Sequence, residues 1–232
     1  MDDLQSPFRR RLLVAGLFPG LQRWFEPLDA KPDSYTAWFE AARMDNVKLC
    51  NDLLTRGFDT NTIEPERLDT ALLIAVRQGS AKVTMLLLST PGVNLDAQSR
   101  NGDTSLMLAA LKKNLPIAQA LIEKGAEINR PGWAALHYAA AAGSLPIVRL
   151  LLDHDAYIDA ESPNKTTPLM MAARGGHRDV AEYLLSQGAD LQAKNELGLR
   201  AVDFARAQGH PALANFLEAS MRESKIQSPS RD

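Results

Sequence analysis

The sequence predicts an all-α fold, a solenoid of about six helix-turn-helix units that carry short β-turn fingers. Three observations lead to this prediction. A short apolar motif recurs with a period near 33 residues, and residues that favour helix ends stand at fixed places around it. Hydrophobic residues make up 45% of the 232 residues and aromatic residues only 6%, so the core is large but suited to closely packed helices.

Six copies of the motif set the organisation of the chain. They read AWFEAA (37–42), ALLIAV (71–76), SLMLAA (105–110), ALHYAA (135–140), PLMMAA (168–173) and AVDFAR (201–206). The matching alanines, at 41, 75, 109, 139, 172 and 205, are separated by 34, 34, 30, 33 and 33 residues. We therefore expect a leader at 1–33, units near 34–66, 67–99, 100–129, 130–162, 163–195 and 196–220, and a polar, disordered tail at 221–232.

Each unit begins with a helix that the sequence marks at both ends. In the fifth unit Thr167 can cap the N-terminus through its hydroxyl, and Pro168 takes the first helical position, where its missing N–H costs nothing. Gly176 ends this helix. The segment DVAEYLL (179–185) then carries apolar residues at helical spacing, which predicts a second helix packed on the first.

Glycine is expected to close the second helix in most units. Gly57, Gly125 and Gly188 stand at this position, where a left-handed backbone conformation favours glycine. Asp155 replaces it in the fourth unit, and aspartate tolerates that conformation at some cost.

The segment EINRPGWAALHYAA (127–140), which leads into the fourth unit, has a shortened finger. From the closing position of the preceding hairpin to the next motif alanine there are 14 residues here, against 17 or 18 elsewhere. The deletion therefore falls before Trp133 and predicts a notch in the row of fingers. Ala134 and Ala135 also stand in place of a Thr-Pro cap, which we expect to cost ~1 kcal/mol of local helix stability.

The segment TTPLMMAARGGHRDVAEYLLSQGADLQAK (166–194) resembles the ankyrin-repeat family nearly position by position, and the resemblance covers roughly 34–218. It implies a protein–protein interaction module or scaffold with no catalysis of its own, and we expect a monomer. Units at the ends of such a solenoid must be modified into caps. Bulky Trp38 and Phe39 in the first unit, and Arg200 and Asp203 in the last, fit that expectation.

The resemblance also implies a partner-binding surface, made of finger positions and of the positions that follow the alanine pair in each first helix. On this sequence we expect it to consist of Arg43, Arg67, Asp69, Arg77, Arg100, Asn101, Asp103, Lys112, Arg130, Trp133, Ala141, Ala142 and Arg174. At the positions that follow the alanine pair, most units have a basic residue, whereas the fourth unit has the small apolar residues Ala141 and Ala142. The expected partner is a protein, whose identity the sequence leaves open.

Two interpretations of Trp133 stay open. An exposed tryptophan beside a flat apolar patch, rimmed by arginines, has the makeup of an interaction hot spot, where one anchor can be worth ~2 kcal/mol or more. Alternatively, the ring folds back and fills the space left by the missing finger residues. The basic residues after the alanine pairs also have a second interpretation, in which they form a helix face that is exposed to solvent and binds no partner.

Other functional classes find little support. With 26 Lys+Arg against 28 Asp+Glu, the net charge of −2 removes the broad electrostatic case for nucleic acid. No glycine-rich phosphate loop, nucleophile elbow or paired-cysteine motif is present, so we expect neither catalysis nor a cofactor. Cys50 is expected to be a small apolar residue of a second helix.

The histidines fit structural positions better than a metal site. His137, His177 and His210 occupy repeated places in the units, at the start of a first or second helix. His154 lies between Asp153 and Asp155, which leaves as an alternative function a metal-dependent or accessory protein that supports an exported enzyme.

The leader has features of an export signal. The segment FRRRLLVAGLFPGL (8–21) places Arg9, Arg10 and Arg11 before about ten apolar residues, too few to span a bilayer. The arginine pair resembles a bacterial twin-arginine signal, and the whole layout resembles bacterial exported ankyrin-repeat proteins. We expect a periplasmic or exported protein without a stable membrane span. The alternatives are a leader helix that packs on the first unit, and a cytoplasmic protein.

Overall fold

A computed structural model describes residues 32–227 of the chain, so residues 1–31 of the expected leader and residues 228–232 lie outside the described part. The described residues form twelve α-helices in six consecutive pairs. The helices are α2 (Pro32–Arg43), α3 (Val47–Thr55), α4 (Ala71–Gln78), α5 (Ala81–Leu88), α6 (Ser105–Leu111), α7 (Leu115–Glu123), α8 (Ala135–Ala142), α9 (Leu145–Asp153), α10 (Pro168–Gly175), α11 (Arg178–Ser186), α12 (Ala201–Ala207) and α13 (Pro211–Gln227). The pairs match the six predicted units in order.

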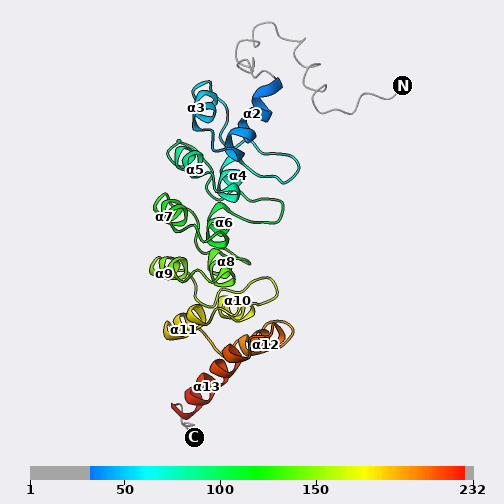
Figure 1. Cartoon of the computed structure of the whole chain (residues 1–232), viewed down its shortest axis with the longest axis vertical. Helices are drawn as coiled ribbons and strands as arrows, with labels where there is room; N and C mark the ends of the chain where they lie inside the picture. Colours follow the sequence, from blue (N-terminus) through cyan, green and yellow to red (C-terminus); the bar gives the residue numbers. More distant parts are fainter. Residues whose placement is uncertain (1–31, 228–232) are drawn as a thin grey trace, which may run out of the picture.

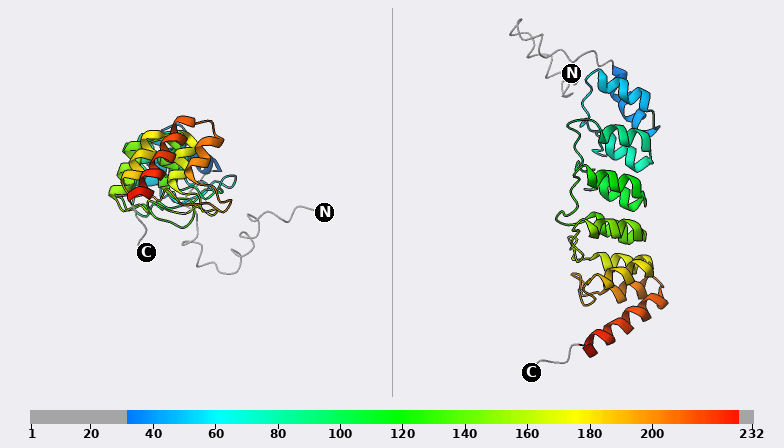
Figure 2. Two further views of the ribbon diagram at one scale, coloured as in Figure 1. Left: turned by 90° about the horizontal axis from the view of Figure 1, so that it is seen from below. Right: turned by 90° about the vertical axis from the view of Figure 1, so that its left-hand side faces the viewer.

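The units stack into a two-layered solenoid. The first helix of each unit packs on the first helices of its neighbours and forms an inner layer, while the second helices form an outer layer beside it (Figure 1). The loops between units run along one edge of this double layer, as the side view in Figure 2 shows. These loops are the predicted fingers. In the described part of the chain their pairing as β-structure is limited to one bridge, between Ile63 and Thr70.

Threonine caps start several inner helices. The hydroxyls of Thr70, Thr104 and Thr167 each accept the backbone N–H three residues later, at 3.4 Å, which satisfies one of the open donors of a helix N-terminus. Helix α8 has Ala134 at its N-cap and therefore no side-chain cap. The cap predicted at Thr167 is thus confirmed, as is its absence in the fourth unit.

Buried alanines hold the inner layer together. Ala75, Ala109, Ala139, Ala172 and Ala205, the motif alanines of units two to six, are all 0% exposed. A leucine from each matching outer helix is also fully buried, at positions 87, 121, 151, 184 and 217. Because adjacent inner helices meet at the alanines, a larger side chain there would overpack the core and cost about 1–3 kcal/mol.

Residues at both ends depart from the repeat. In the first unit Trp38 and Phe39 are buried, and the Trp38 ring centroid lies 5.0 Å from that of Phe58. In the last unit α13 continues to Gln227, so residues 221–227 are helical and differ from the disordered tail expected from residue 221. No glycine or proline interrupts residues 221–227.

Left-handed residues close the hairpins as the sequence predicts. Gly57, Gly125 and Gly188 have φ of 83°, 90° and 95°, and Asp155 has φ 61° in the equivalent place. The repeat therefore keeps its geometry in the fourth unit, where the glycine is lost. The irregularity of that unit lies in its finger.

Candidate functional site

Three of the four longer fingers share a turn that fixes their shape. In these three, a backbone N–H donates to the carbonyl four residues later, and the bonds join Ser99 to Asp103 (3.0 Å), Ser162 to Thr166 (3.1 Å) and Asn195 to Leu199 (3.0 Å). The side chain of the first residue supports the same turn. Ser99 Oγ accepts from the N–H of Asn101 and Asp103, and Asn195 Oδ1 accepts from Leu197 and Leu199. These hydrogen bonds between side chain and backbone fix the conformation of the turn.

Backbone hydrogen bonds also join fingers in pairs. Arg100 N–H donates to Arg67 O at 2.7 Å, and Glu196 N–H donates to Asn164 O at 3.1 Å. The guanidinium of Arg100 reinforces the first pair by donating to Pro65 O at 3.1 Å.

The short finger of the fourth unit takes no part in this pairing. Within the described chain, residues 128–133 make no backbone-to-backbone hydrogen bond. In the next finger the equivalent of Arg100 and Glu196 is Pro163. Because proline has no N–H, this finger cannot donate a backbone hydrogen bond to the short finger. The loop between α7 and α8 also projects less far than the loops on either side (Figure 1). The predicted notch is therefore present, and it separates two joined pairs of fingers.

Trp133 lies at this notch and is half-buried. Its ring meets the ring of His137 edge-on, with centroids 5.2 Å apart and planes at 74°, and that of Tyr138 at 6.5 Å and 86°. The indole thus lies on the first turn of α8, and part of its surface stays open to solvent. Trp133 thus packs on α8, as in the interpretation in which it fills the shortened finger, and keeps exposed surface, as in the interpretation in which it anchors a partner.

His137 holds the base of the short finger in place. Its ring is fully buried, its Nδ1 accepts the N–H of Ala134 at 3.2 Å, and its Nε2 donates to Thr166 O at 2.9 Å. These partners require the neutral tautomer with the proton on Nε2. Burial lowers the pKa of His137, against an opposing effect of the Thr166 carbonyl. The structural role predicted for this histidine is what the geometry supports.

Two acidic members of the expected surface are buried. Asp69 is 1% exposed and accepts from Arg77 Nη2 at 3.1 Å. Asp103 is 9% exposed and accepts from the hydroxyl of Tyr138 at 2.6 Å. Burial, followed by this carboxylate, raises the pKa of Tyr138. The expectation that Asp69 and Asp103 offer surface to a partner needs correction, because both are used to attach a finger to an inner helix.

The arginines of the first two units are also engaged. Arg43 pairs with Glu64 and Arg77 with Asp69. A polar cleft of about 210 Å³ lies here, lined by Arg43, Glu64, Glu66, Arg67, Asp69, Ile74, Arg77 and Gln78. It is smaller and more charged than the apolar pockets that small molecules usually occupy. The exposed Glu66 and Arg67 take part in neither of these two ion pairs.

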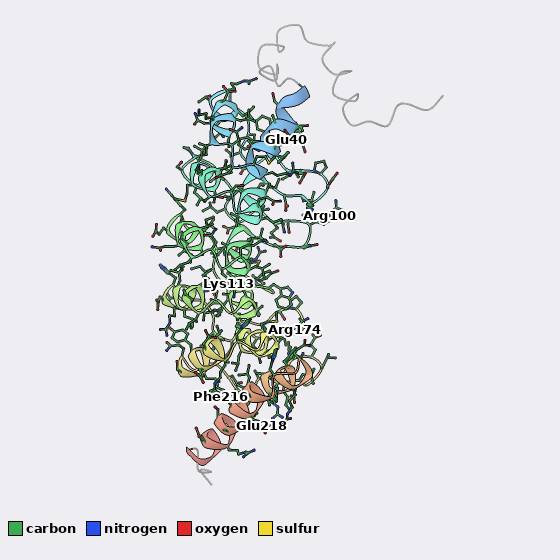
Figure 3. The ribbon with its side chains drawn as sticks, in the orientation of Figure 1. Glu40, Arg100, Lys113, Arg174, Phe216 and Glu218 are labelled. Carbon is green, nitrogen blue, oxygen red and sulfur yellow. The ribbon has the colours of Figure 1, made fainter. Side chains whose placement is uncertain are left out.

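Basic residues of units three to five have a different environment. Among residues 32–227, no carboxylate lies within ion-pair distance of Lys112, Arg130 or Arg174. The same holds for Lys113, which the sequence analysis did not include and whose φ of 56° turns the chain between α6 and α7. Figure 3 labels Lys113 at that turn and Arg174 near the end of α10. The sequence did offer a signal for Lys113, because it is the second of two consecutive lysines that follow the third copy of the motif.

Small apolar surface lies between these cations. Ala141 and Ala142, in the last turn of α8, are half-buried, and Leu111 at the end of α6 is 45% exposed. Ala141 O accepts from Nε2 of His177 at 3.0 Å, so the surface here is fixed by the next unit. Asn101 and Arg100 are exposed on the finger before the notch.

The residues considered for other chemistry are not brought together. Asp153, His154 and Asp155 are exposed at the end of α9, and no group of three or more potential metal ligands gathers among the residues described. Cys50 is buried, and this burial raises the pKa of its thiol to about 11. In the part of the chain that the structure covers, no helix has the length and apolar character needed to cross a bilayer.

Comparison with known proteins points to one family. The family model for ankyrin repeats, in three copies, matches residues 38–131 and 130–195. Protein glp-1 of Caenorhabditis elegans is 30% identical across 82% of this chain, and SH3 and multiple ankyrin repeat domains protein 2 of Homo sapiens is 29% identical across 74%. A putative palmitoyltransferase, ZDHHC13 of Danio rerio, is 28% identical across 96%. The chain spans only 16%, 10% and 38% of these three relatives, respectively.

Proposed function

This chain belongs to the ankyrin-repeat family, and from that premise we propose that it binds a protein partner on its fingers and inner helices, around the short finger of the fourth unit. Ankyrin repeats indicate a protein–protein interaction module. The position of the binding surface is our proposal, and one observation carries it. The row of paired fingers is interrupted where a half-buried tryptophan adjoins small apolar residues and cations without carboxylate partners.

The composition of this surface suits binding rather than folding. Tryptophan and arginine are the residues that most often dominate the energy of an interface, and they do so where neighbouring contacts exclude water. Trp133 is already held by His137 and Tyr138, so little side-chain freedom would be lost when a partner covers it. A fixed anchor next to the flat surface of Ala141 and Ala142 is the arrangement that a protein interface needs.

We also propose that the protein has no catalysis of its own. The likeness to a putative palmitoyltransferase covers only 38% of that protein, so its activity is not carried over to this chain. Support for the proposal comes from the site itself, where the polar atoms of the buried His137 and the half-buried Tyr138 form hydrogen bonds within the fold.

A site-specific photo-crosslinker tests where a partner binds. It would replace Lys112, the exposed residue that directly follows the inner helix α6, and in a matched protein Asp153, which is exposed on the outer helix α9. In cells of the source organism we expect a discrete crosslinked protein from position 112 and a reduced yield when Trp133→Ala is added. The same crosslinked band from position 153, undiminished by Trp133→Ala, would contradict the proposed surface.

Export is a separate proposal. It rests on Arg9 and Arg10 before an apolar run, in a segment outside the described residues. The N-terminal residue of protein recovered from cell fractions decides it, since an intact Met1 in the cytoplasmic fraction would rule out a cleaved signal.

A further inference from the structure

The charged side chains of the binding surface fall into two sets. In the first two units the arginines of the inner helices are compensated, because Arg43 pairs with Glu64 and Arg77 with Asp69. In units three to five, Lys112, Lys113 and Arg174 have no such partner among the described residues. The middle of the surface is therefore locally positive, although the whole chain carries a net charge of −2.

The nearby acids do not neutralise this region. Asp103 is buried, and its two carboxylate oxygens bond the hydroxyls of Tyr138 and Ser99. Glu161 is exposed on the following finger, but that finger also carries the exposed Lys165. A partner that approaches the notch thus meets an excess of cations.

Arg130 gives the positive region an unmet hydrogen-bonding requirement. It belongs to the short finger, it is half-buried, and its Nη1 is buried without an acceptor in the structure. A buried donor that lacks an acceptor is costly, and a charged one more so. A carboxylate is the acceptor that matches a guanidinium best, because it can take two parallel N–H bonds.

The short finger also leaves main-chain groups open. Residues 128–133 make no backbone hydrogen bond to other backbone groups of the described chain, whereas the longer fingers pair with each other. An extended peptide segment can use such open groups when it lies along the edge of a loop.

We propose that the partner contributes an extended acidic segment, which lies across units three to five. In this arrangement its carboxylates meet Arg130, Lys112 and Arg174, while an apolar side chain lies against Trp133 and the surface of Ala141. The proposal depends on the binding surface proposed above and adds the chemistry of the partner to it. Opposite charge at such a surface speeds association and selects against basic partners.

Selection from random peptides tests this proposal without a known partner. The peptides would have about twelve residues, which reach about 40 Å when extended and so can cross several units. The full-length protein, its Lys112→Glu/Arg174→Glu variant and a Lys82→Glu/Lys124→Glu variant would each be used as bait. The last two variants change the net charge equally, but Lys82 and Lys124 are exposed in the outer layer, on α5 and after α7. Matching thermal unfolding of the three baits would show that each is folded.

We expect the wild-type protein to enrich peptides that combine Asp or Glu with one large apolar residue. Their affinity should fall about tenfold or more in Lys112→Glu/Arg174→Glu and in Arg130→Gln, remain unchanged in Lys82→Glu/Lys124→Glu, and weaken as salt is raised. Enriched peptides without acidic residues, blocked by Trp133→Ala, would overturn the acidic partner while leaving the binding surface intact. Failure to enrich any peptide above background would count against both proposals.

Discussion

The imidazole of His177 occupies the space that a side chain on Gly143 would need. A Cβ built on Gly143 would lie 2.3 Å from Nδ1 of His177, while Nε2 of the same ring is 3.0 Å from Ala141 O. The end of α8 and the start of α11 are therefore locked together across the boundary between the fourth and fifth units.

Gly143→Ala should destabilise the protein more than the matched substitution Gly79→Ala. Both glycines end an inner helix with positive φ, at 70° and 80°, so alanine costs about 1–2 kcal/mol of backbone strain at either site. Only Gly143 has a ring against it, since nothing lies within 4 Å of a Cβ at Gly79. Chemical denaturation of the two variants measures the difference, and equal losses in free energy of unfolding would mean that the ring moves aside freely.

His137 should make the stability depend on pH on the acid side of neutrality. Because burial lowers its pKa below the ordinary 6.5, the unfolded chain binds a proton that the folded chain excludes. The free energy of unfolding should therefore fall as pH drops below about 6.5, by up to about 1.4 kcal/mol per pH unit, until the folded-state pKa is reached. His137→Gln should be less stable at pH 7 but flatter over this range. An unchanged slope in that variant would assign the pH dependence to other groups.

Tyr138→Phe should loosen the finger between α5 and α6, which carries Asp103, from the fourth unit. The substitution removes the 2.6 Å bond to Asp103 and leaves a buried carboxylate with one hydroxyl partner fewer, for which we expect a loss of about 1–3 kcal/mol. A double-mutant cycle with Asp103→Asn isolates the pair from other effects of each change. Additive losses would show that the two side chains are not coupled in solution.

The repeat could be predicted from sequence because its signals are local. Caps such as Thr167, the closing position of Asp155 and the spacing of the motif alanines each act within one unit. The shortened finger could be predicted from the number of residues between one hairpin and the next motif alanine. The same alignment placed Asp69 and Asp103 on the binding surface, where the structure buries them.

The failure for these two aspartates has a physical reason. Whether a finger residue is exposed depends on which side chain an inner helix presents to it, and this is Arg77 for Asp69 but Tyr138 of the next unit for Asp103. The first pairing lies within one unit but depends on the particular side chain at position 77, and the second joins two units, so neither is contained in the general pattern of the repeat. The orientation of Trp133 depends in the same way on the rings of His137 and Tyr138.

Ala134→Thr should stabilise the fourth unit by supplying the missing cap. Ala134 has the extended backbone that Thr104 and Thr167 have at the start of their helices, with ψ of 164° against 168° and 165°. A threonine hydroxyl there can accept the N–H of His137, and such a cap is typically worth ~1 kcal/mol. Ala134→Val is the matched control, because valine has nearly the same shape but no hydroxyl. Denaturation midpoints that rise in the threonine variant and fall in the valine variant would identify the cap as the cause. A loss of stability in both would instead show that Trp133 and the short finger leave no room beside this helix end.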